Sequence, residues 1–273
     1  MDFDRAAELV SRADALLICA GAGMGVDSGL PDFRGDRGFW QAYPPYQRLG
    51  LRFVELADPL HFVEDPALAW GFYGHRLALY RRTVPHQGFD ILRRWGSALP
   101  QGFRTFTSNV DGQFQRAGFE HVAEVHGSIH HLQCAGRCTD ELWPADDAAL
   151  RVDPETMRAV GELPSCPNCG GLARPNILMF GDYEWIGTRS RQALDELTSW
   201  RRSLHAANLV VVEIGAGNAV PTVRRQAELA TAANGALIRI NPREAEIRHD
   251  RGVSLPTGAL AALSEIDARL VSS

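Results

Sequence analysis

The sequence lacks the features that would place the protein in a membrane or on nucleic acid. Its 273 residues include no apolar run that approaches the roughly 20 residues needed to span a bilayer. There are 28 Lys and Arg residues against 33 Asp and Glu, for a net charge of −5, and no basic run. Residues 1–5 are acidic and lack the charged-then-apolar layout of a secretory signal. We therefore expect a cytoplasmic protein with no membrane partner and no direct nucleic-acid partner.

Repeats and low-complexity tracts are also absent, and cysteine is scarce, with five residues in the chain. An apolar content of 45% and a charged content of 22% are ordinary for a globular protein. The length suffices for one large domain, or for one domain with a smaller insert, with a real hydrophobic core. The sequence is compatible with a monomer.

Strands alternate with helices along most of the chain. Apolar runs predict core strands over residues 15–18, 103–107, 122–125, 209–214 and 236–240. Apolar periodicity predicts helices over residues 4–13, 66–82, 88–95, 111–116, 189–206, 222–233 and 257–270. This alternation predicts an α/β fold with one doubly wound parallel sheet. Two stretches interrupt it: an aromatic-rich, helical excursion over 35–85 and a cysteine-bearing insert over 130–174.

A glycine-rich turn follows the first predicted strand. Gly21, Gly23 and Gly25 omit side chains where the backbone must turn sharply and can approach a ligand. A strand that runs into such a turn is how nucleotide-binding α/β folds present backbone N–H groups to a pyrophosphate. The glycines alone fit an ordinary strand-to-helix turn equally well.

Two polar clusters follow later strands. Residues 107–112, Thr-Ser-Asn-Val-Asp-Gly, begin where the strand 103–107 ends, at the edge where α/β folds place ligand contacts. A helix N-cap by Asn109 or Asp111 would explain the same residues. His126 ends the short strand 122–125 beside a glycine, and a lone histidine is usually a surface or core residue. These clusters are therefore interpreted together with the rest of the chain.

Four of the five cysteines form two close pairs. Cys134 and Cys138 make the first pair, Cys166 and Cys169 make the second, and 27 residues lie between the pairs. Two such pairs can supply four thiolates to one zinc ion in a tetrahedron, which leaves no position for water, so the zinc would be structural. Free thiols or disulfides suit this spacing less well. The fifth cysteine, Cys19, is expected to pack in a core strand.

The predicted helix 66–82 carries a possible carboxylate site. Ala69, Tyr73 and Arg76 occupy positions i, i+4 and i+7 and share one helix face. A phenol beside a guanidinium can bind a carboxylate, which arginine holds bidentately, and the small Ala69 would leave room. The alternative is a core tyrosine beside a solvated arginine.

Taken together, these motifs resemble those of the sirtuins, the NAD-dependent protein-lysine deacylases. Residues 19–34, where Pro-Asp-Phe-Arg follows the glycine turn, are similar to the first NAD-binding motif of that family. Residues 107–111 and 126–127 resemble its Thr-Gln-Asn-Ile-Asp and His-Gly motifs. Residues 174–182 resemble the segment that pairs with the substrate peptide as an added strand, and the cysteine pairs lie where sirtuins carry a zinc module. The resemblance covers essentially the whole chain.

The resemblance implies a domain organisation and a role for each matching residue. It implies a Rossmann-like NAD-binding domain in three parts (1–34, 86–129 and 175–273), a helical excursion (35–85) and a small zinc-binding domain (130–174). His126 would be the general base, while Asn109 and Asp111 would orient the nicotinamide carboxamide and ribose. NAD contacts are implied for Gly21, Ala22, Gly23, Asp32, Phe33, Arg34, Ser108, Asn109, Asp111, Gly215, Ala216, Gly217 and Asn241. Substrate contacts are implied for Tyr73, Arg76, Ile177, Met179, Phe180 and Gly181.

The chain departs from the family pattern at three places. Met24 and Gly25 replace an isoleucine and a serine, and Ser108 replaces a glutamine. Ala216 and Gly217 replace the usual Thr-Ser pair, so two hydroxyls near the adenine ribose are lost. NAD binding is still expected, because backbone groups make many of its contacts.

The resemblance implies removal of acyl groups such as acetyl from lysines of proteins or peptides. Tyr73 and Arg76 resemble the Tyr-x-x-Arg pair of sirtuins that remove negatively charged acyl groups, so acidic groups such as succinyl or malonyl are expected as well. NAD would be the co-substrate, and nicotinamide and O-acyl-ADP-ribose would be products. Two alternatives stay open. One is an NAD-dependent ADP-ribosyltransferase or NAD glycohydrolase, and the other is a non-catalytic sensor of NAD or ADP-ribose.

Overall fold

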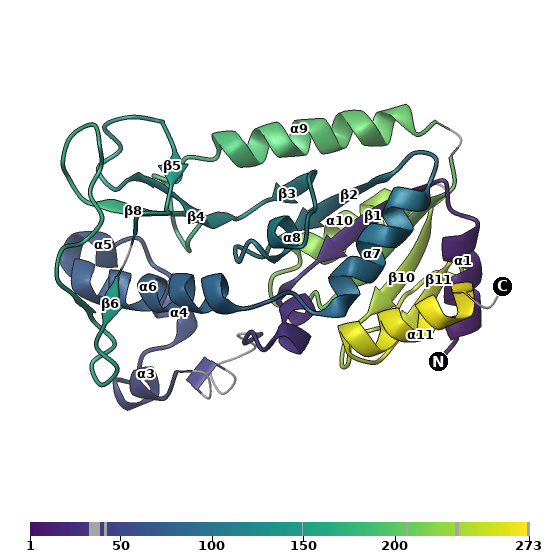
Figure 1. Ribbon diagram of the computed structural model, residues 1–273, viewed down its shortest axis with the longest axis horizontal. Coiled ribbons are helices and arrows are strands. Elements are labelled where there is room, and N and C mark those ends of the chain that lie inside the picture. Colours follow the sequence, from purple (N-terminus) through teal and green to yellow (C-terminus); the bar gives the residue numbers. More distant parts are fainter. Residues whose placement is uncertain (33–38, 41–42, 149, 206, 233–234, 272–273) are drawn as a thin grey trace.

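Figure 1 shows the structure of the chain, a computed structural model. It describes residues 1–32, 39–40, 43–148, 150–205, 207–232 and 235–271. Two predicted NAD contacts, Phe33 and Arg34, lie outside the described residues.

A parallel six-stranded sheet forms the larger part of the described chain. Its strand order is β11-β10-β9-β1-β2-β3. The bounds are β1 Ala15–Ala20, β2 Phe103–Thr107, β3 Val122–Glu124, β9 Leu209–Ile214, β10 Ala236–Ile240 and β11 Gly252–Leu255. Going along the chain, β2 and β3 follow β1 toward one edge of the sheet. The later strands β9, β10 and β11 lie on the other side of β1 and extend to the opposite edge. Ligands of such sheets bind where the strand order reverses, which here lies between β1 and β9.

The sheet is covered by helices on both faces, so its central strands are apolar on both sides. Every residue of β1 is buried. Leu16 and Ile18 face one cluster with α1 Phe3–Ser11, α7 Gln87–Ala98 and α11 Ala259–Val271. Leu17 and Cys19 face the opposite cluster with α9 Thr188–Ser203 and α10 Thr222–Thr231. This three-layer arrangement is visible in Figure 1, and it is why β1 reads as an unbroken apolar run.

A smaller module lies at the other end of the molecule (Figure 1). Its antiparallel sheet has the order β5-β4-β8, and β6 pairs with β7. The strands are β4 Gly127–Cys134, β5 Trp143–Pro144, β6 Arg151–Val152, β7 Ala159–Val160 and β8 Ala173–Ile177. In the described part of the excursion, the helices include α3 Pro44–Arg48, α4 Phe53–Leu56, α5 His61–Glu64 and α6 Pro66–Arg82. These helices share one aromatic-rich cluster with β4 and β8, so the excursion and the zinc-bearing insert pack on a common core.

The predicted fold class is confirmed, and several boundaries differ from those expected. The strands 103–107, 209–214 and 236–240 and the helix 66–82 have the predicted limits. The glycine turn continues as the 3-10 helix η1, Ala22–Ser28, and the helix expected over 111–116 is the shorter α8, Gln113–Arg116. The edge strand β11 was not predicted. In the described residues, no helix has the length and apolar character needed to cross a bilayer. The expected cytoplasmic location stays a prediction.

Candidate active site

The site is centred where β1 and β9 end, at the reversal of strand order. The turns that follow these strands touch through their backbones: Gly23 N donates to Gly215 O at 3.1 Å. A Cβ added to Gly23 would lie 2.6 Å from the Gly215 Cα, and one added to Gly21 would lie 2.8 Å from the Ala216 Cα. Gly215 itself has a φ of +62°. Glycine is needed here because two backbones meet with no room for side chains between them.

A cavity of about 840 Å³ opens beside these turns and extends to the smaller module. It brings together most of the residues singled out from the sequence. The predicted residues that line it are Gly21, Ala22, Asp32, Tyr73, Arg76, Ser108, Asn109, Asp111, His126, Ile177, Met179, Phe180, Gly215, Ala216 and Gly217. Of the described residues predicted to contact NAD or substrate, three are not among its lining, namely Gly23, Gly181 and Asn241. Gly23 and Asn241 instead hold the turns together, and Ala69, which was expected to leave space, is buried away from the lining.

Asn109 is held against the glycine turn. Its Nδ2 donates to Gly21 O at 3.0 Å, and its backbone N–H donates to Thr107 Oγ1 at 3.0 Å. The Thr107 hydroxyl in turn donates to Ala20 O at 2.9 Å. These contacts cross from β2 to β1, so the Asn109 amide is oriented before any ligand arrives.

Burial influences two titratable groups that line the cavity, Asp111 and His126. Asp111 is buried, and desolvation raises its carboxyl pKa to about 6, although its Oδ1 accepts from Gln113 N at 2.9 Å. Burial lowers the pKa of His126 below its ordinary 6.5. A neutral imidazole is the form that can accept a proton, so burial favours the basic form of His126 at neutral pH.

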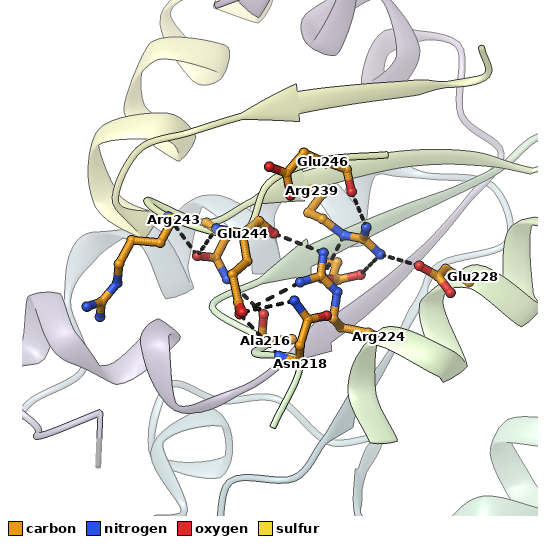
Figure 2. A network of polar contacts seen from close by, with 10 residues as sticks. Ala216, Asn218, Arg224, Glu228, Arg239, Arg243, Glu244 and Glu246 are labelled. Carbon is orange, nitrogen blue, oxygen red and sulfur yellow. Dashed lines mark hydrogen bonds and ion pairs between the residues drawn. The ribbon is translucent and has the colours of Figure 1, made fainter. Parts of the chain in front are cut away.

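The cavity wall formed by residues 215–218 is held by the loop that follows β10 (Figure 2). Glu244 accepts from Asn218 twice, from the backbone N–H at 3.1 Å and from Nδ2 at 2.9 Å. The buried Asn241 donates from Nδ2 to Ala216 O at 2.7 Å. Its Oδ1 accepts the backbone N–H of both Arg243 and Glu244 at 3.1 Å. Asn241 therefore fixes the backbone beside the cavity.

Buried charges continue this support away from the cavity (Figure 2). Arg224 donates to the Glu244 carbonyl at 2.9 Å. Arg239 binds Glu213 bidentately at 2.9 and 2.7 Å, and it also reaches Glu228 at 3.0 Å. Because bidentate arginine pairs fix geometry, β9, β10 and α10 are locked at the end that carries the cavity wall.

Tyr73 and Arg76 both project from α6 toward the cavity. The Tyr73 side chain is 1% exposed, and its hydroxyl has no hydrogen-bond partner among the described residues. Burial raises the pKa of Tyr73 to about 12, so the phenol stays a neutral donor. The Arg76 guanidinium lies 5.1 Å from the centre of the Phe72 ring, in contact distance for a cation–π interaction. A phenol donor and a cation thus meet at one end of the cavity.

The predicted peptide segment begins as the buried strand β8. This strand pairs with β4 and has no second strand partner among the described residues, so it is an edge strand of the antiparallel sheet. Its outer side is covered, because Ala173 donates to Pro164 O at 2.8 Å and accepts from Trp70 Nε1 at 2.9 Å. The buried Arg174 pairs with Asp182 and donates to Ile177 O at 3.1 Å, which ties the segment into a loop. Beyond β8, Leu178 N donates to His126 O at 2.9 Å and leaves Phe180 half exposed at the cavity.

The four predicted zinc ligands converge as expected. The sulfur atoms of Cys134, Cys138, Cys166 and Cys169 all lie within 4.8 Å of one another. The closest pairs are Cys134–Cys169 at 3.8 Å and Cys138–Cys166 at 3.6 Å. A tetrahedron with Zn–S bonds of about 2.3 Å has edges of roughly 3.8 Å, so this set fits one zinc ion. The site is a four-cysteine zinc site, and its closed ligand set gives it a structural character.

Several residues that line the cavity were not identified from the sequence. They are contributed by segments without a recognised motif: Phe53, Tyr80, Asn218, Arg243 and Glu244. Arg243 reaches across to Asp32, with Nη2 3.3 Å from Oδ2. For Arg243 and Glu244, the available signal was a polar cluster directly after a core strand, which is where such sheets place ligand contacts.

Comparison with known proteins identifies the family. The family model described as "Sir2 family" matches residues 21–220, which is most of the chain and spans the glycine turn, the histidine, the cysteines and the β9 turn. The chain belongs to the Sir2 family, the sirtuins.

Similar curated proteins agree on the class of enzyme. NAD-dependent protein deacylase 1 of Pseudomonas aeruginosa is 31% identical over 262 residues, covering 95% of each chain. The mitochondrial NAD-dependent protein deacylase sirtuin-5 of Danio rerio is 32% identical over 220 residues, covering 75% of this chain and 67% of its own. The protein is therefore an NAD-dependent protein deacylase of the sirtuin family, with NAD as its co-substrate.

Solved structures agree on the fold. A mutant Sir2 homologue in complex with ADP-ribose superimposes with a TM-score of 0.75 at 25% identity, covering 98% of this chain and 96% of the other. A complex of a Sir2 homologue with NAD gives a TM-score of 0.74 at 24% identity. The predicted fold, a Rossmann-like parallel sheet with a small four-cysteine module, is thereby confirmed. The boundaries of the five predicted segments stay predictions.

Proposed function

We propose that the enzyme prefers lysines that carry an acidic acyl group of the succinyl or malonyl type. The observation that carries this proposal is the meeting of Tyr73 and Arg76 in the same cavity as Asn109, Asp111 and His126. The guanidinium is buried, with 5% of the residue exposed, and stays charged because arginine does not deprotonate in proteins.

An acyl carboxylate fits the chemistry of this end of the cavity. A carboxylate accepts charge-assisted hydrogen bonds from arginine, and the positive charge of the buried guanidinium would attract it. The Tyr73 hydroxyl supplies a further donor. A neutral acetyl group offers no charge and fewer acceptors, so it would gain less from this end of the cavity. The curated zebrafish relative is named a protein deacylase rather than a deacetylase, which is consistent with a broader acyl range.

The remaining site residues have proposed roles that follow their positions. The turns around Gly21, Ala22, Gly23, Gly215, Ala216 and Gly217 would hold the phosphates and adenosine of NAD, supported by Asn241, with Asp32, Phe33, Arg34 and Ser108 toward the nicotinamide half. Asn109 and Asp111 would orient the nicotinamide carboxamide and ribose. His126 would accept a proton from a ribose hydroxyl, so that the acyl group passes to the ribose and lysine is released. The products would be nicotinamide and O-acyl-ADP-ribose.

The peptide is proposed to bind as an extended strand beside Ile177, Met179, Phe180 and Gly181. One support is the segment beyond β8, where Leu178 and Phe180 line the cavity and are partly exposed, since extended peptides bind such segments through main-chain hydrogen bonds. A second is a structural relative of the same fold, Sir2Tm, which was solved with a propionylated peptide. We therefore propose acyl-lysine proteins or peptides as the partners.

The test compares two peptides that differ only in the acyl group, acetyl-lysine and succinyl-lysine, with mass spectrometry of all products. We expect a higher kcat/KM for the succinyl peptide, and NAD-dependent formation of O-succinyl-ADP-ribose. Arg76→Met should reverse the preference by raising KM for the succinyl peptide. Arg82→Met, which removes an exposed arginine near the end of the same helix, serves as the control and should leave the preference unchanged. A wild-type preference for acetyl would contradict the proposal.

A second reaction of NAD has one specific observation in its favour. Ala216 and Gly217 lack the hydroxyls that the family commonly has, and Ser108 is shorter than the usual glutamine. A looser ribose could be captured by water or by protein. The same product analysis tests this: nicotinamide release without loss of either acyl group would identify a glycohydrolase or ADP-ribosyltransferase.

A further inference from the structure

Tyr80 lies in the same cavity wall as Tyr73 and Arg76. Arg76 donates to the Tyr80 hydroxyl oxygen twice, from Nε at 3.1 Å and from Nη2 at 2.9 Å. The Tyr80 side chain is 4% exposed. Positions 73, 76 and 80 are i, i+3 and i+7 on α6, so one helix face presents two phenols and a guanidinium to the cavity.

The contact between Tyr80 and Arg76 determines how the guanidinium is oriented. Arginine is a long side chain with much rotamer freedom, and a ligand that binds it must first order it. The rings of Phe72 and Phe53 flank Arg76 at 5.1 and 5.8 Å, but a ring face accepts a cation over a range of orientations. Two hydrogen bonds that converge on one oxygen fix both the plane of the guanidinium and its rotation within that plane.

The Tyr80 hydroxyl also has a donor to offer. Its oxygen accepts both bonds from Arg76, so its hydrogen points away from the guanidinium. The Tyr73 hydroxyl, on the same helix face, has no hydrogen-bond partner in the described part of the chain. Buried phenols normally find an acceptor. A carboxylate at this end of the cavity would supply acceptors for both hydroxyls.

We propose that Tyr80 is a specificity-determining residue that positions Arg76 for the acyl carboxylate. This inference rests on the proposed acidic-acyl preference. Acid recognition then depends on three residues of one helix face, Tyr73, Arg76 and Tyr80, and the orientation of the guanidinium comes from the third. Turnover of a neutral acyl group does not use this orientation and is independent of the Tyr80 hydroxyl.

The test is Tyr80→Phe, which removes the hydroxyl and keeps the ring, assayed on matched succinyl and acetyl peptides. We expect kcat/KM for the succinyl peptide to fall by about tenfold, mainly through KM, because a hydrogen bond to a charged group is lost. Acetyl turnover should stay within about twofold of wild type, since only the carboxylate uses the contact. Tyr80→Met fills similar space without a hydroxyl and should behave alike. Tyr46→Phe removes the hydroxyl of another buried tyrosine, which belongs to the same aromatic cluster and does not line the cavity. This variant should leave kcat/KM unchanged for both peptides.

The outcomes separate this inference from the proposed function. If Arg76→Met lowers the succinyl-to-acetyl ratio and Tyr80→Phe does not, the acidic preference stands and the role of Tyr80 is wrong. If both peptides lose activity equally in Tyr80→Phe and Tyr80→Met, Tyr80 is a packing residue and the inference is overturned. If Arg76→Met leaves the ratio unchanged, or wild type does not prefer succinyl, both proposals fail together.

Discussion

The buried carboxyl group of Asp111 lowers the free energy of unfolding at neutral pH, where it would be charged. Its carboxyl pKa is raised from 3.8 to about 6, first because burial disfavours the charge. The folded chain therefore binds this proton more tightly than the unfolded chain. The resulting stabilisation is fully present below about pH 4 and is lost as the pH rises through 6.

Replacing the Asp111 carboxyl group with a neutral amide should remove this destabilisation. Asp111→Asn keeps an oxygen that can accept from Gln113 N and removes the charge. We expect the variant to be more stable than wild type above pH 6, by roughly 2–3 kcal/mol, with no gain below about pH 4. Urea unfolding of both proteins, with zinc present, at pH 8 and at pH 4 measures this difference. A gain that is equal at both pH values would contradict the assignment, and deacylation by the variant should be impaired despite its stability.

Residue types with a defined local role could be predicted from the sequence, whereas residues recruited from elsewhere could not. Asn109, His126 and the four cysteines stand in recognisable patterns, and the structure brings them into the cavity and into one sulfur cluster. Tyr80 stands in no recognised motif, and Glu244 belongs only to a polar cluster that follows a core strand. Tyr80 reaches the cavity because α6 turns one face toward it, and Glu244 because the loop after β10 folds back on residues 215–218.

At the scale of elements, the two glycine turns act as one joint between β1 and β9. The sequence suggested that these glycines let the backbone approach a ligand. The structure shows that they also let the backbones of the two turns pack directly against each other. Helix 66–82 had the predicted limits because Pro66 stands at its first turn and Asp65 caps it by accepting from Leu68 N. Three core strands had the predicted limits because each is a short run of mostly aliphatic, aromatic or β-branched residues. Strands β5, β6 and β7 have two residues each, and β11 has four. Such short strands depend on their neighbours for stability, so no local pattern predicts them.

The joint makes a prediction about Gly23. A methyl group at this position would lie 2.6 Å from the Gly215 Cα, and backbone cannot move aside as a side chain can. We expect Gly23→Ala to lower the free energy of unfolding by about 1–3 kcal/mol and to weaken NAD binding. Thermal unfolding with and without NAD reads out both effects. Gly136→Ala is the matched control, because a Cβ there meets nothing within 4 Å and φ is not positive. Equal behaviour of the two variants would argue against a packed joint.

At the scale of the whole molecule, two strands connect the zinc site to the cavity. β4 begins next to His126 and ends at the zinc ligand Cys134, and β8 begins shortly after Cys169 and leads to Ile177 at the cavity. The antiparallel pairing of β4 with β8 thus spans the distance between a structural ion and the proposed general base.

Removal of zinc should therefore abolish deacylation although no cysteine lines the cavity. We expect activity to fall in parallel with zinc content during chelation, and to return when zinc is restored before the protein aggregates. The six-stranded sheet should keep its secondary structure in circular dichroism, since its core clusters contain no zinc ligand. Full turnover by zinc-free protein would show that the smaller module holds its shape without the ion.

The position of β1 at the centre of the sheet has a consequence for how the chain folds. β1 ends at residue 20, and its partner β9 begins at residue 209, so most of the chain must be synthesised before the pair can form. During translation the edge of β1 that pairs with β9 stays unpaired until β9 has been synthesised. Strand pairs with such a long sequence separation form slowly. The proposed NAD-binding joint exists only after β9 has docked. NAD would thus stabilise the folded protein and would not stabilise nascent chains. A shortage of NAD would therefore lower the free energy of unfolding of folded molecules and leave the rate of folding unchanged.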